Sequence, residues 1–288
     1  MPKMRKEIRR IWLRYRMYMQ VAPGFAVCAF MAAAMTLGSG CMNCTTNPRY
    51  PEPAAEASLR LAQYAQSPSV PERPILVLGG YMDPGFASGS LERALRRACG
   101  PDTEIVAVSF GDCTSMAQCR DRLMAATRAL RAARPECAFD VVANSMGGLI
   151  ARYSALPEDE IARCGLPSPA QAGMLRIHHL YTICTPHRGA LMAEGPLGSP
   201  MTKDMRPGSR FLSCLDSALP SAPYGLTCFA RAGDSIVGAD RSAPAGIEPI
   251  LFDTPPFELA HVDAHRDPRI LLVIVRGLRG EPSLPLGE

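Results

Sequence analysis

One stretch of the sequence limits the possible folds more than any other. Residues 141–153 read VVANSMGGLIARY, in which an apolar run with β-branched residues meets small residues and then a helical pattern. The stretch therefore predicts a strand, a sharp turn and a helix, with Ser145 at the turn. In a parallel sheet such a turn lifts the serine hydroxyl above the strand ends, between a base and backbone N–H groups. This is the geometry that acyl transfer requires.

The turn admits only small residues two positions before and two positions after the serine, because the backbone bends tightly there. Ala143 and Gly147 occupy these positions. Gly147 and Gly148 would let the helix begin close to the strand, with its first amides facing the site.

Length and charge narrow the class of protein. The 288 residues, of which 47% are hydrophobic, suffice for one globular α/β domain but not for two domains with linkers. The net charge of +4 comes from the first 40 residues, since residues 41–288 carry 24 basic and 26 acidic side chains. This balance gives no sign of a nucleic-acid surface, and we expect no nucleic-acid partner.

Residues 1–40 predict an export signal or a membrane anchor. Seven basic residues precede residues 21–40, which are uncharged and apolar as far as Leu37. The length of this apolar run is about the minimum for a membrane-spanning helix. The segment could therefore be a signal that is cleaved off or an anchor that stays in the membrane. The run GSGC at 38–41 resembles a bacterial lipobox, although Leu37 lies one position too far from Cys41. We expect a secreted or envelope protein that contacts the membrane through this segment.

The 11 cysteines suit an oxidising compartment, in which disulfides form. Nine of them follow residue 41, an odd number that leaves at least one thiol free, and the spacing does not fix the connectivity. The first pairs to consider close short loops: Cys113 with Cys119, and Cys214 with Cys228. No cysteine pair with zinc-ligand spacing is followed by a second ligand pair, so we expect no metal site.

The rest of the chain alternates two patterns. Residues 41–73 are rich in proline and predict a tether, interrupted by a short helix near 56–66, before a domain at 74–288. The domain pattern predicts strands at 75–78, 104–110, 139–143, 176–183, 225–230 and 249–252, and helices at 90–99, 116–133 and 267–278. This alternation predicts a mostly parallel sheet flanked by helices. Ser145, Gly80, Thr185 and the segment after Ala230 would then meet at one sheet edge.

A serine nucleophile needs a histidine that takes its proton and a carboxylate that orients the histidine. His261 follows the last strand, where the base belongs in the order Ser, Asp, His, and His265 is the alternative. Asp234 directly follows a strand and precedes an apolar pair, and Asp240 is the alternative acid. The remaining histidines lie within a predicted strand or a turn: His178, His179 and His187.

Taken together, these motifs resemble the α/β-hydrolase superfamily and, within it, the lipase and esterase group. They are the serine turn followed by MGGLIAR, TPHRGA at 185–190, RPGSRFL at 206–212, GDSIV at 233–237 and the late histidine. The resemblance covers about residues 74–278 and implies an α/β-hydrolase fold with Ser145 as nucleophile, Asp234 as acid and His261 as general base. The oxyanion-hole donors that it implies are the amides of Met146 and of Gly80 or Tyr81.

Two departures from the family pattern stand out. Residues 78–81 read LGGY where the family often has His-Gly, and the serine turn carries Ala143 and Asn144.

Residues 189–223 contain apolar side chains among glycines and prolines, and they resemble a cap over an acyl pocket. An edge of the domain that is simply well packed would give the same pattern.

An apolar cap favours esters with hydrophobic acyl chains, including lipids. We therefore expect a serine ester hydrolase of the carboxylesterase or lipase type that needs no cofactor. Amide hydrolysis or acyl transfer on the same residues is the alternative. A non-catalytic envelope protein that binds through a hydrolase scaffold is the competing class.

Overall fold

The computed structural model describes residues 52–167, 170–171, 173–196 and 198–282. In this part of the chain six strands form one sheet, in which all neighbours are parallel and the order is β2-β1-β3-β4-β5-β6. The strands are β1 (Ile75–Leu78), β2 (Ile105–Val108), β3 (Phe139–Asn144), β4 (Ile177–Ile183), β5 (Gly225–Arg231) and β6 (Ile250–Phe252). The predicted α/β class with a parallel sheet is confirmed.

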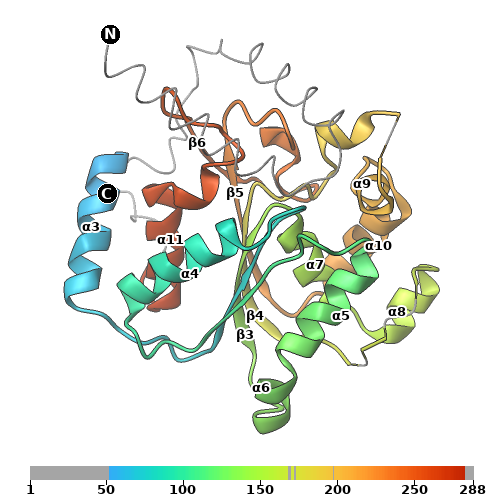
Figure 1. The fold of residues 1–288 in the computed structure, drawn as a ribbon, viewed down its shortest axis with the longest axis horizontal. Coiled ribbons are helices and arrows are strands. Elements are labelled where there is room, and N and C mark those ends of the chain that lie inside the picture. The colour runs from blue at the N-terminus through green and yellow to red at the C-terminus, as the bar shows by residue number, and fades with distance from the viewer. Residues whose placement is uncertain (1–51, 168–169, 172, 197, 283–288) are drawn as a thin grey trace. The chain divides into compact units, whose positions relative to one another are not determined.

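Helices cover both faces of the sheet (Figure 1). On one side lie α4 (Phe86–Cys99) and α11 (Pro268–Leu278), with α3 (Ala54–Gln66) packed on both of them. On the other side lie α5 (Met116–Ala126), α6 (Arg128–Ala133), α7 (Met146–Ser154), α8 (Glu158–Arg163), α9 (Pro200–Asp204) and α10 (Arg210–Ala218). Helices on both faces explain why β1, with the sequence ILVL, is a continuous apolar run rather than an alternating one.

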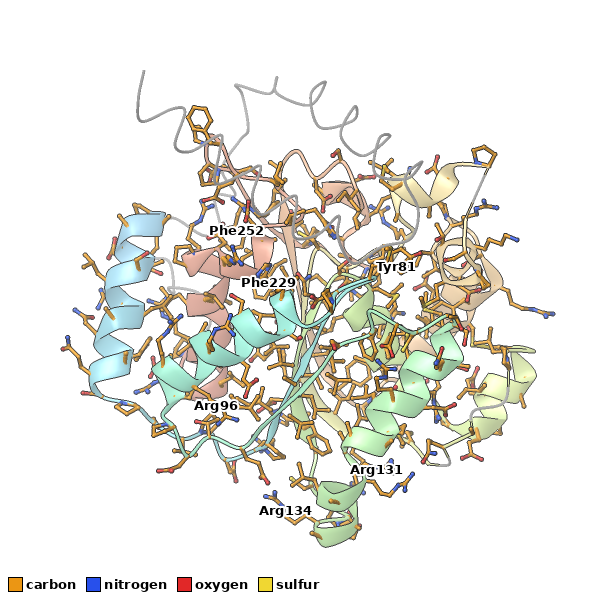
Figure 2. All side chains as sticks on the ribbon, viewed as in Figure 1. Tyr81, Arg96, Arg131, Arg134, Phe229 and Phe252 are labelled. Carbon is orange, nitrogen blue, oxygen red and sulfur yellow. A yellow bond between two sulfur atoms is a disulfide. The ribbon has the colours of Figure 1, made fainter. Side chains whose placement is uncertain are left out.

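Strand β1, which lies between β2 and β3, shows how the two cores are filled. All four of its residues are fully buried, and successive side chains point to opposite faces. Ile75 and Val77 belong to the core under α4 and α11, whereas Leu76 and Leu78 belong to the core that α5 and α7 cover. On the α11 side the rings of Phe229 and Phe252 lie 6.3 Å apart (Figure 2).

The helix predicted at 116–133 is divided into α5 and α6 at Thr127. The hydroxyl of this residue donates back to the carbonyl groups of Leu123 (3.0 Å) and Met124 (3.3 Å) in the preceding turn. Such back-bonding by threonine competes with the regular helix pattern and bends helices. Hydrophobic spacing alone does not reveal this local competition.

The segment expected to be a tether is docked on the domain from Glu52 onward. The Glu52 carboxylate makes two 2.8 Å bonds to the Arg276 guanidinium of α11, and Tyr64 hydrogen-bonds Glu281. Leu61 and Tyr64 pack against the core under α11 and α4. The reason is that α3 carries an apolar stripe, which these two helices bury.

The expected signal or anchor at residues 1–40 and the lipobox at Cys41 lie outside the described residues. Within the ranges that the structure does describe, no helix combines the length and the apolar character needed to cross a bilayer.

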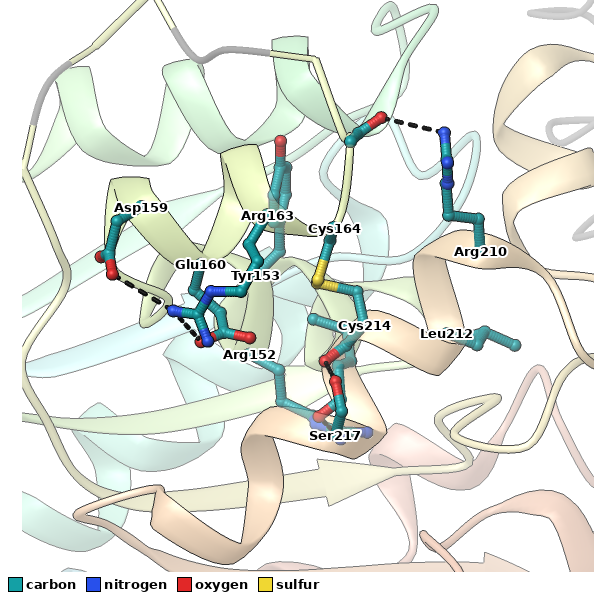
Figure 3. Close-up of a disulfide and its surroundings, with 12 residues drawn as sticks. Arg152, Tyr153, Asp159, Glu160, Arg163, Cys164, Arg210, Leu212, Cys214 and Ser217 are labelled. Carbon is teal, nitrogen blue, oxygen red and sulfur yellow. Dashed lines mark hydrogen bonds and ion pairs between the residues drawn. A yellow bond between two sulfur atoms is a disulfide. The ribbon is translucent and has the colours of Figure 1, made fainter.

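One disulfide joins Cys164, at the end of α8, to Cys214 in α10, with the two Cα atoms 5.8 Å apart (Figure 3). The two short-loop pairs considered first do not form, because Cys113, Cys119 and Cys228 carry free buried thiols. Cys228 instead lies within β5, where its sulfur is 3.8 Å from a ring nitrogen of His187. The observed pair is 50 residues apart in sequence and meets only in the tertiary structure.

Candidate active site

Ser145 occupies the turn between β3 and α7 with φ 53° and ψ −129°. A positive φ is uncommon for a residue with a side chain, and such strain persists only where the surroundings fix it. Here the Ser145 N–H donates to the Ile183 carbonyl of β4 (2.8 Å), and the Thr185 hydroxyl donates to the Ser145 carbonyl (2.7 Å). The strained turn is thus held by hydrogen bonds from the neighbouring strand end.

The two glycines after Met146 allow α7 to begin against the sheet. A β-carbon at Gly147 would lie 2.6 Å from the Gly79 carbonyl oxygen, and one at Gly148 would lie 2.4 Å from the Thr185 hydroxyl. Neither position leaves space for a methyl group. The small residues in the motif are therefore required by contacts with two other loops.

His261 lies in the loop between β6 and α11, and its side chain is 12% exposed. Its Nε2 is 3.0 Å from the Ser145 hydroxyl and its Nδ1 is 2.8 Å from Oδ2 of Asp234. An ionised carboxylate only accepts hydrogen bonds, so Nδ1 carries the proton in the neutral ring and Nε2 accepts from the serine. The histidine is poised to take the serine proton.

Asp234 follows β5 at a buried turn. Its Oδ1 accepts hydrogen bonds from the N–H groups of Ile236 (2.9 Å) and Val237 (3.0 Å), which leaves Oδ2 for His261. Burial acts to raise the pKa of Asp234. The electrostatic interaction and hydrogen bond with His261, together with the two N–H groups, outweigh burial and hold the pKa below its ordinary value. The carboxylate is therefore ionised beside the ring.

The two alternatives left open by the sequence lie outside this network. Asp240 has a side chain that is 76% exposed and lies 4.0 Å from Arg188. His265 is buried, and within the described residues neither of its ring nitrogens has a hydrogen-bond partner. Burial, and then the charge of Arg266, lowers the pKa of His265 to about 4. Neither residue hydrogen-bonds to Ser145 or His261 in the described chain.

The predicted oxyanion-hole segments border the serine. A β-carbon at Gly80 would lie 3.0 Å from Cβ and 3.5 Å from Oγ of Ser145, so this loop runs beside the nucleophile. Met146 is the first residue of α7, where backbone N–H groups have no partner within the helix. The phenol of Tyr81 turns to Ser199 at the start of α9, 3.1 Å away.

Asp83 is a residue that the sequence analysis missed. Its buried carboxylate ties down the loop that contains Gly80, because it accepts hydrogen bonds from four successive N–H groups at the start of α4: those of Gly85, Phe86, Ala87 and Ser88. An aspartate just ahead of a helix is a typical capping signal, and it was available in the sequence DPGF.

The TPHRGA motif has a structural role. His187 is fully buried, with Nδ1 2.9 Å from the Arg152 guanidinium and Nε2 3.1 Å from the Thr182 hydroxyl. Arg152 also donates to the Leu215 carbonyl (2.7 Å), so that β4, α7 and α10 are joined. His178 and His179 hydrogen-bond to residues in neighbouring strands: Asp140 and Thr227.

One group in the described ranges has the spacing of a metal site. Cys184, Asp234 and His261 each offer a ligand atom within 4.8 Å of the others. Asp234 and His261 already hydrogen-bond each other there. Their closeness is explained without an ion.

No family model and no curated protein matches this sequence. Among solved structures, phospholipase PlaB from Legionella pneumophila gives a TM-score of 0.49 at 13% identity over 73% of this chain and 59% of that one. The lin2722 gene product from Listeria innocua gives a TM-score of 0.48 at 13% identity, over 69% of this chain and 90% of that one. Mature lipase BlEst2 from Bacillus licheniformis gives a TM-score of 0.43 at 14% identity, over 67% of this chain and 89% of that one. In the PlaB complex with thio-NAD, the chain spans 36% of the matched protein.

The fold itself is that of the α/β-hydrolases, as the order and direction of the strands and the position of the serine turn require. At the carboxyl ends of β3, β5 and β6 it brings together a serine, an aspartate and a histidine in one hydrogen-bonded chain.

Proposed function

We propose that the protein is a serine hydrolase that cleaves carboxylic esters through an acyl-enzyme intermediate. The observation that carries the proposal is the continuous hydrogen-bonded chain from Asp234 through His261 to Ser145, with links of 2.8 and 3.0 Å. The order of these residues along the chain and the positive φ of the serine are those of a nucleophile turn.

In the first half of the reaction, Nε2 of His261 takes the hydroxyl proton while Oγ of Ser145 forms a bond to the ester carbonyl carbon. The N–H of Met146 and an N–H at Gly80 or Tyr81 would stabilise the resulting oxyanion. The carbon–oxygen bond to the alcohol then breaks, and His261 donates the proton to the leaving alcohol. The products are the free alcohol and an ester on Ser145.

In the second half, water replaces the alcohol. His261 takes a proton from the water as the hydroxyl oxygen attacks the acyl carbon, and it returns the proton to Oγ of Ser145 when the acid leaves. Asp234 stays ionised throughout and stabilises the imidazolium that forms twice in each cycle.

Hydrophobic acyl groups are the substrates that we propose. Segments that adjoin the site residues along the chain also carry large apolar side chains that are at least 37% exposed: Met82, Phe86, Leu191 and Phe257. Residues 189–223, which include α9 and α10, would act as the cap. The Cys164–Cys214 disulfide, which fixes α10, supports the proposal that the protein works outside the cytoplasm.

The test is hydrolysis of chromogenic esters, from acetyl to palmitoyl, by the full chain in detergent. We expect turnover that falls by about 10⁴-fold or more in Ser145→Ala, since the nucleophile is removed. Ser58→Ala changes an exposed serine on α3, outside the proposed cap, and should keep full activity. The preferred chain length would separate an esterase from a lipase, and amide substrates and acceptor alcohols would test the two variants of the chemistry.

A folded protein that neither turns over esters nor reacts with a fluorophosphonate probe would contradict the proposal. A binding role on the same scaffold would then be the better account.

A further inference from the structure

Cys184 lies close to Asp234, the acid of the site, and the catalytic steps described above give it no role. It is the first residue after β4, its N–H donates to the Phe229 carbonyl of β5 (2.8 Å), and it is fully buried. Its sulfur is within 4.8 Å of a carboxylate oxygen of Asp234 and of a ring nitrogen of His261. A side chain with one weak donor therefore faces the buried carboxylate.

We propose that the Cys184 thiol donates a hydrogen bond to the Asp234 carboxylate and so positions the acid of the triad. The inference rests on the proposed function and deepens it. It makes Cys184 a positioning residue, because the thiol acts on the reacting atoms only through Asp234 and His261.

The carboxylate has room for this donor. An ionised carboxylate can accept about four hydrogen bonds. Two reach Oδ1 from the N–H groups of Ile236 and Val237, and one reaches Oδ2 from His261. The thiol supplies a further donor in a place that water does not reach, since Asp234 is only 4% exposed.

The thiol keeps its proton, as a donor must. Burial, and then the charge of Asp234, raises the pKa of Cys184 well above its ordinary value, and contacts with Arg231 only partly oppose this. The charged groups that act on the sulfur are thus the Asp234 carboxylate and the Arg231 guanidinium, beside the imidazole of His261. A thiolate beside Asp234 would repel the carboxylate that the triad needs.

The backbone points to the same role. Cys184 has φ 48°, a value at which glycine is unstrained and a residue with a side chain is not. In the described residues the other non-glycine positions with positive φ are Met82, Ser145 and Phe257, all in loops that border the site. The chain accepts strain at Cys184 and thereby sets a sulfur beside Asp234.

Three substitutions separate the thiol from its backbone. Cys184→Ala removes the donor and keeps the strain, Cys184→Gly removes both, and Cys184→Ser restores a donor as O–H. We expect kcat for ester hydrolysis to fall about fivefold in the alanine and glycine variants, the equivalent of one hydrogen bond, with KM unchanged. In the serine variant kcat should be largely restored. The acidic limb of the pH profile should move to higher pH, because a carboxylate with one donor fewer is more basic and holds the imidazolium proton more tightly. The value of kcat falls all the same, because a carboxylate that is held less firmly orients the His261 ring less well.

Infrared spectroscopy tests the contact without relying on activity. The difference spectrum between wild type and Cys184→Ala should show an S–H stretching band lowered in frequency by hydrogen bonding, and Asp234→Asn should move that band upward. Should the cysteine variants fail to fold, the difference between wild type and Asp234→Asn decides.

An S–H band at the frequency of a free thiol would overturn the inference. So would alanine and glycine variants with wild-type kcat and pH profile. A protein without any esterase activity would refute the proposed function, and the infrared band would still report whether the thiol contacts Asp234.

Discussion

Replacing Gly147 by alanine tests whether the serine turn depends on close backbone packing. The new methyl group would stand 2.6 Å from the Gly79 carbonyl oxygen and 3.0 Å from Cβ of Leu78. These atoms belong to β1 and the residue after it, and they cannot swing aside like the end of a flexible side chain. Helix α7 would have to move from β1 by roughly half an ångström or more to restore ordinary contact distances.

The expected cost follows from two opposed effects. Overpacking in a filled core costs about 1–3 kcal/mol, whereas alanine gains about 1 kcal/mol over glycine within a helix. We expect a net loss of up to about 2 kcal/mol in the free energy of unfolding, or up to roughly 8 °C in Tm for a domain of this size. Because Ser145 directly precedes α7, its hydroxyl moves as well, and kcat/KM should fall roughly 10- to 100-fold.

Thermal unfolding and ester hydrolysis measure the two effects, and Gly89→Ala is the matched control. Gly89 lies within α4, where a β-carbon would meet only the end of the flexible Arg93 side chain, at 3.3 Å. The control should therefore keep its activity and melt at the same or a higher temperature. A Gly147→Ala protein as stable and active as wild type, or a control that loses as much, would refute the packing argument.

Three further outcomes follow from the structure. Burial, and then the Arg152 charge, holds the pKa of His187 well below its ordinary value. The contribution of His187 to the free energy of unfolding is therefore fully present above about pH 6.5, and it falls by up to about 1.4 kcal/mol per pH unit below that, as the unfolded chain takes up the proton. Urea unfolding at several pH values measures this slope, and an equal slope in His187→Gln would contradict its assignment to His187. Replacing Cys164 and Cys214 by serine should lower the free energy of unfolding by about 4 kcal/mol for a 50-residue loop, and an unchanged urea midpoint would show that the disulfide does not stabilise the domain. Asp234→Asn should leave the protein folded and reduce kcat about 10⁴-fold, whereas a loss of less than tenfold would show that the carboxylate does not orient His261.

Much of the fold could be predicted because both faces of the sheet are covered. Strands such as β1 then appear as short, wholly apolar runs, and the turn at Ser145 has a local signature in its small residues. Asp234 and His261 could be predicted as the acid and the base of the site because each follows a strand in the order Ser, Asp, His. Residues that follow parallel strands lie at the same edge of the sheet.

Other features depend on contacts that no local pattern records. The division at Thr127 arises from one hydroxyl bonding back to its own helix, and the pairing of Cys164 with Cys214 depends on how α8 and α10 meet. The docking of α3 depends on an ion pair and a helix face formed by the far end of the chain. The place of Cys184 beside Asp234 likewise follows from the meeting of two strand ends.

The central claim is that Ser145 is the nucleophile, and the most direct test is the site of a covalent adduct. The folded full chain would be treated with a fluorophosphonate, digested and mapped by mass spectrometry, with a His261→Ala protein treated in parallel. We predict a single adduct on Ser145 in wild type, formed far more slowly without the histidine that activates the hydroxyl. An adduct on another residue, or no adduct on the folded protein, would contradict the account.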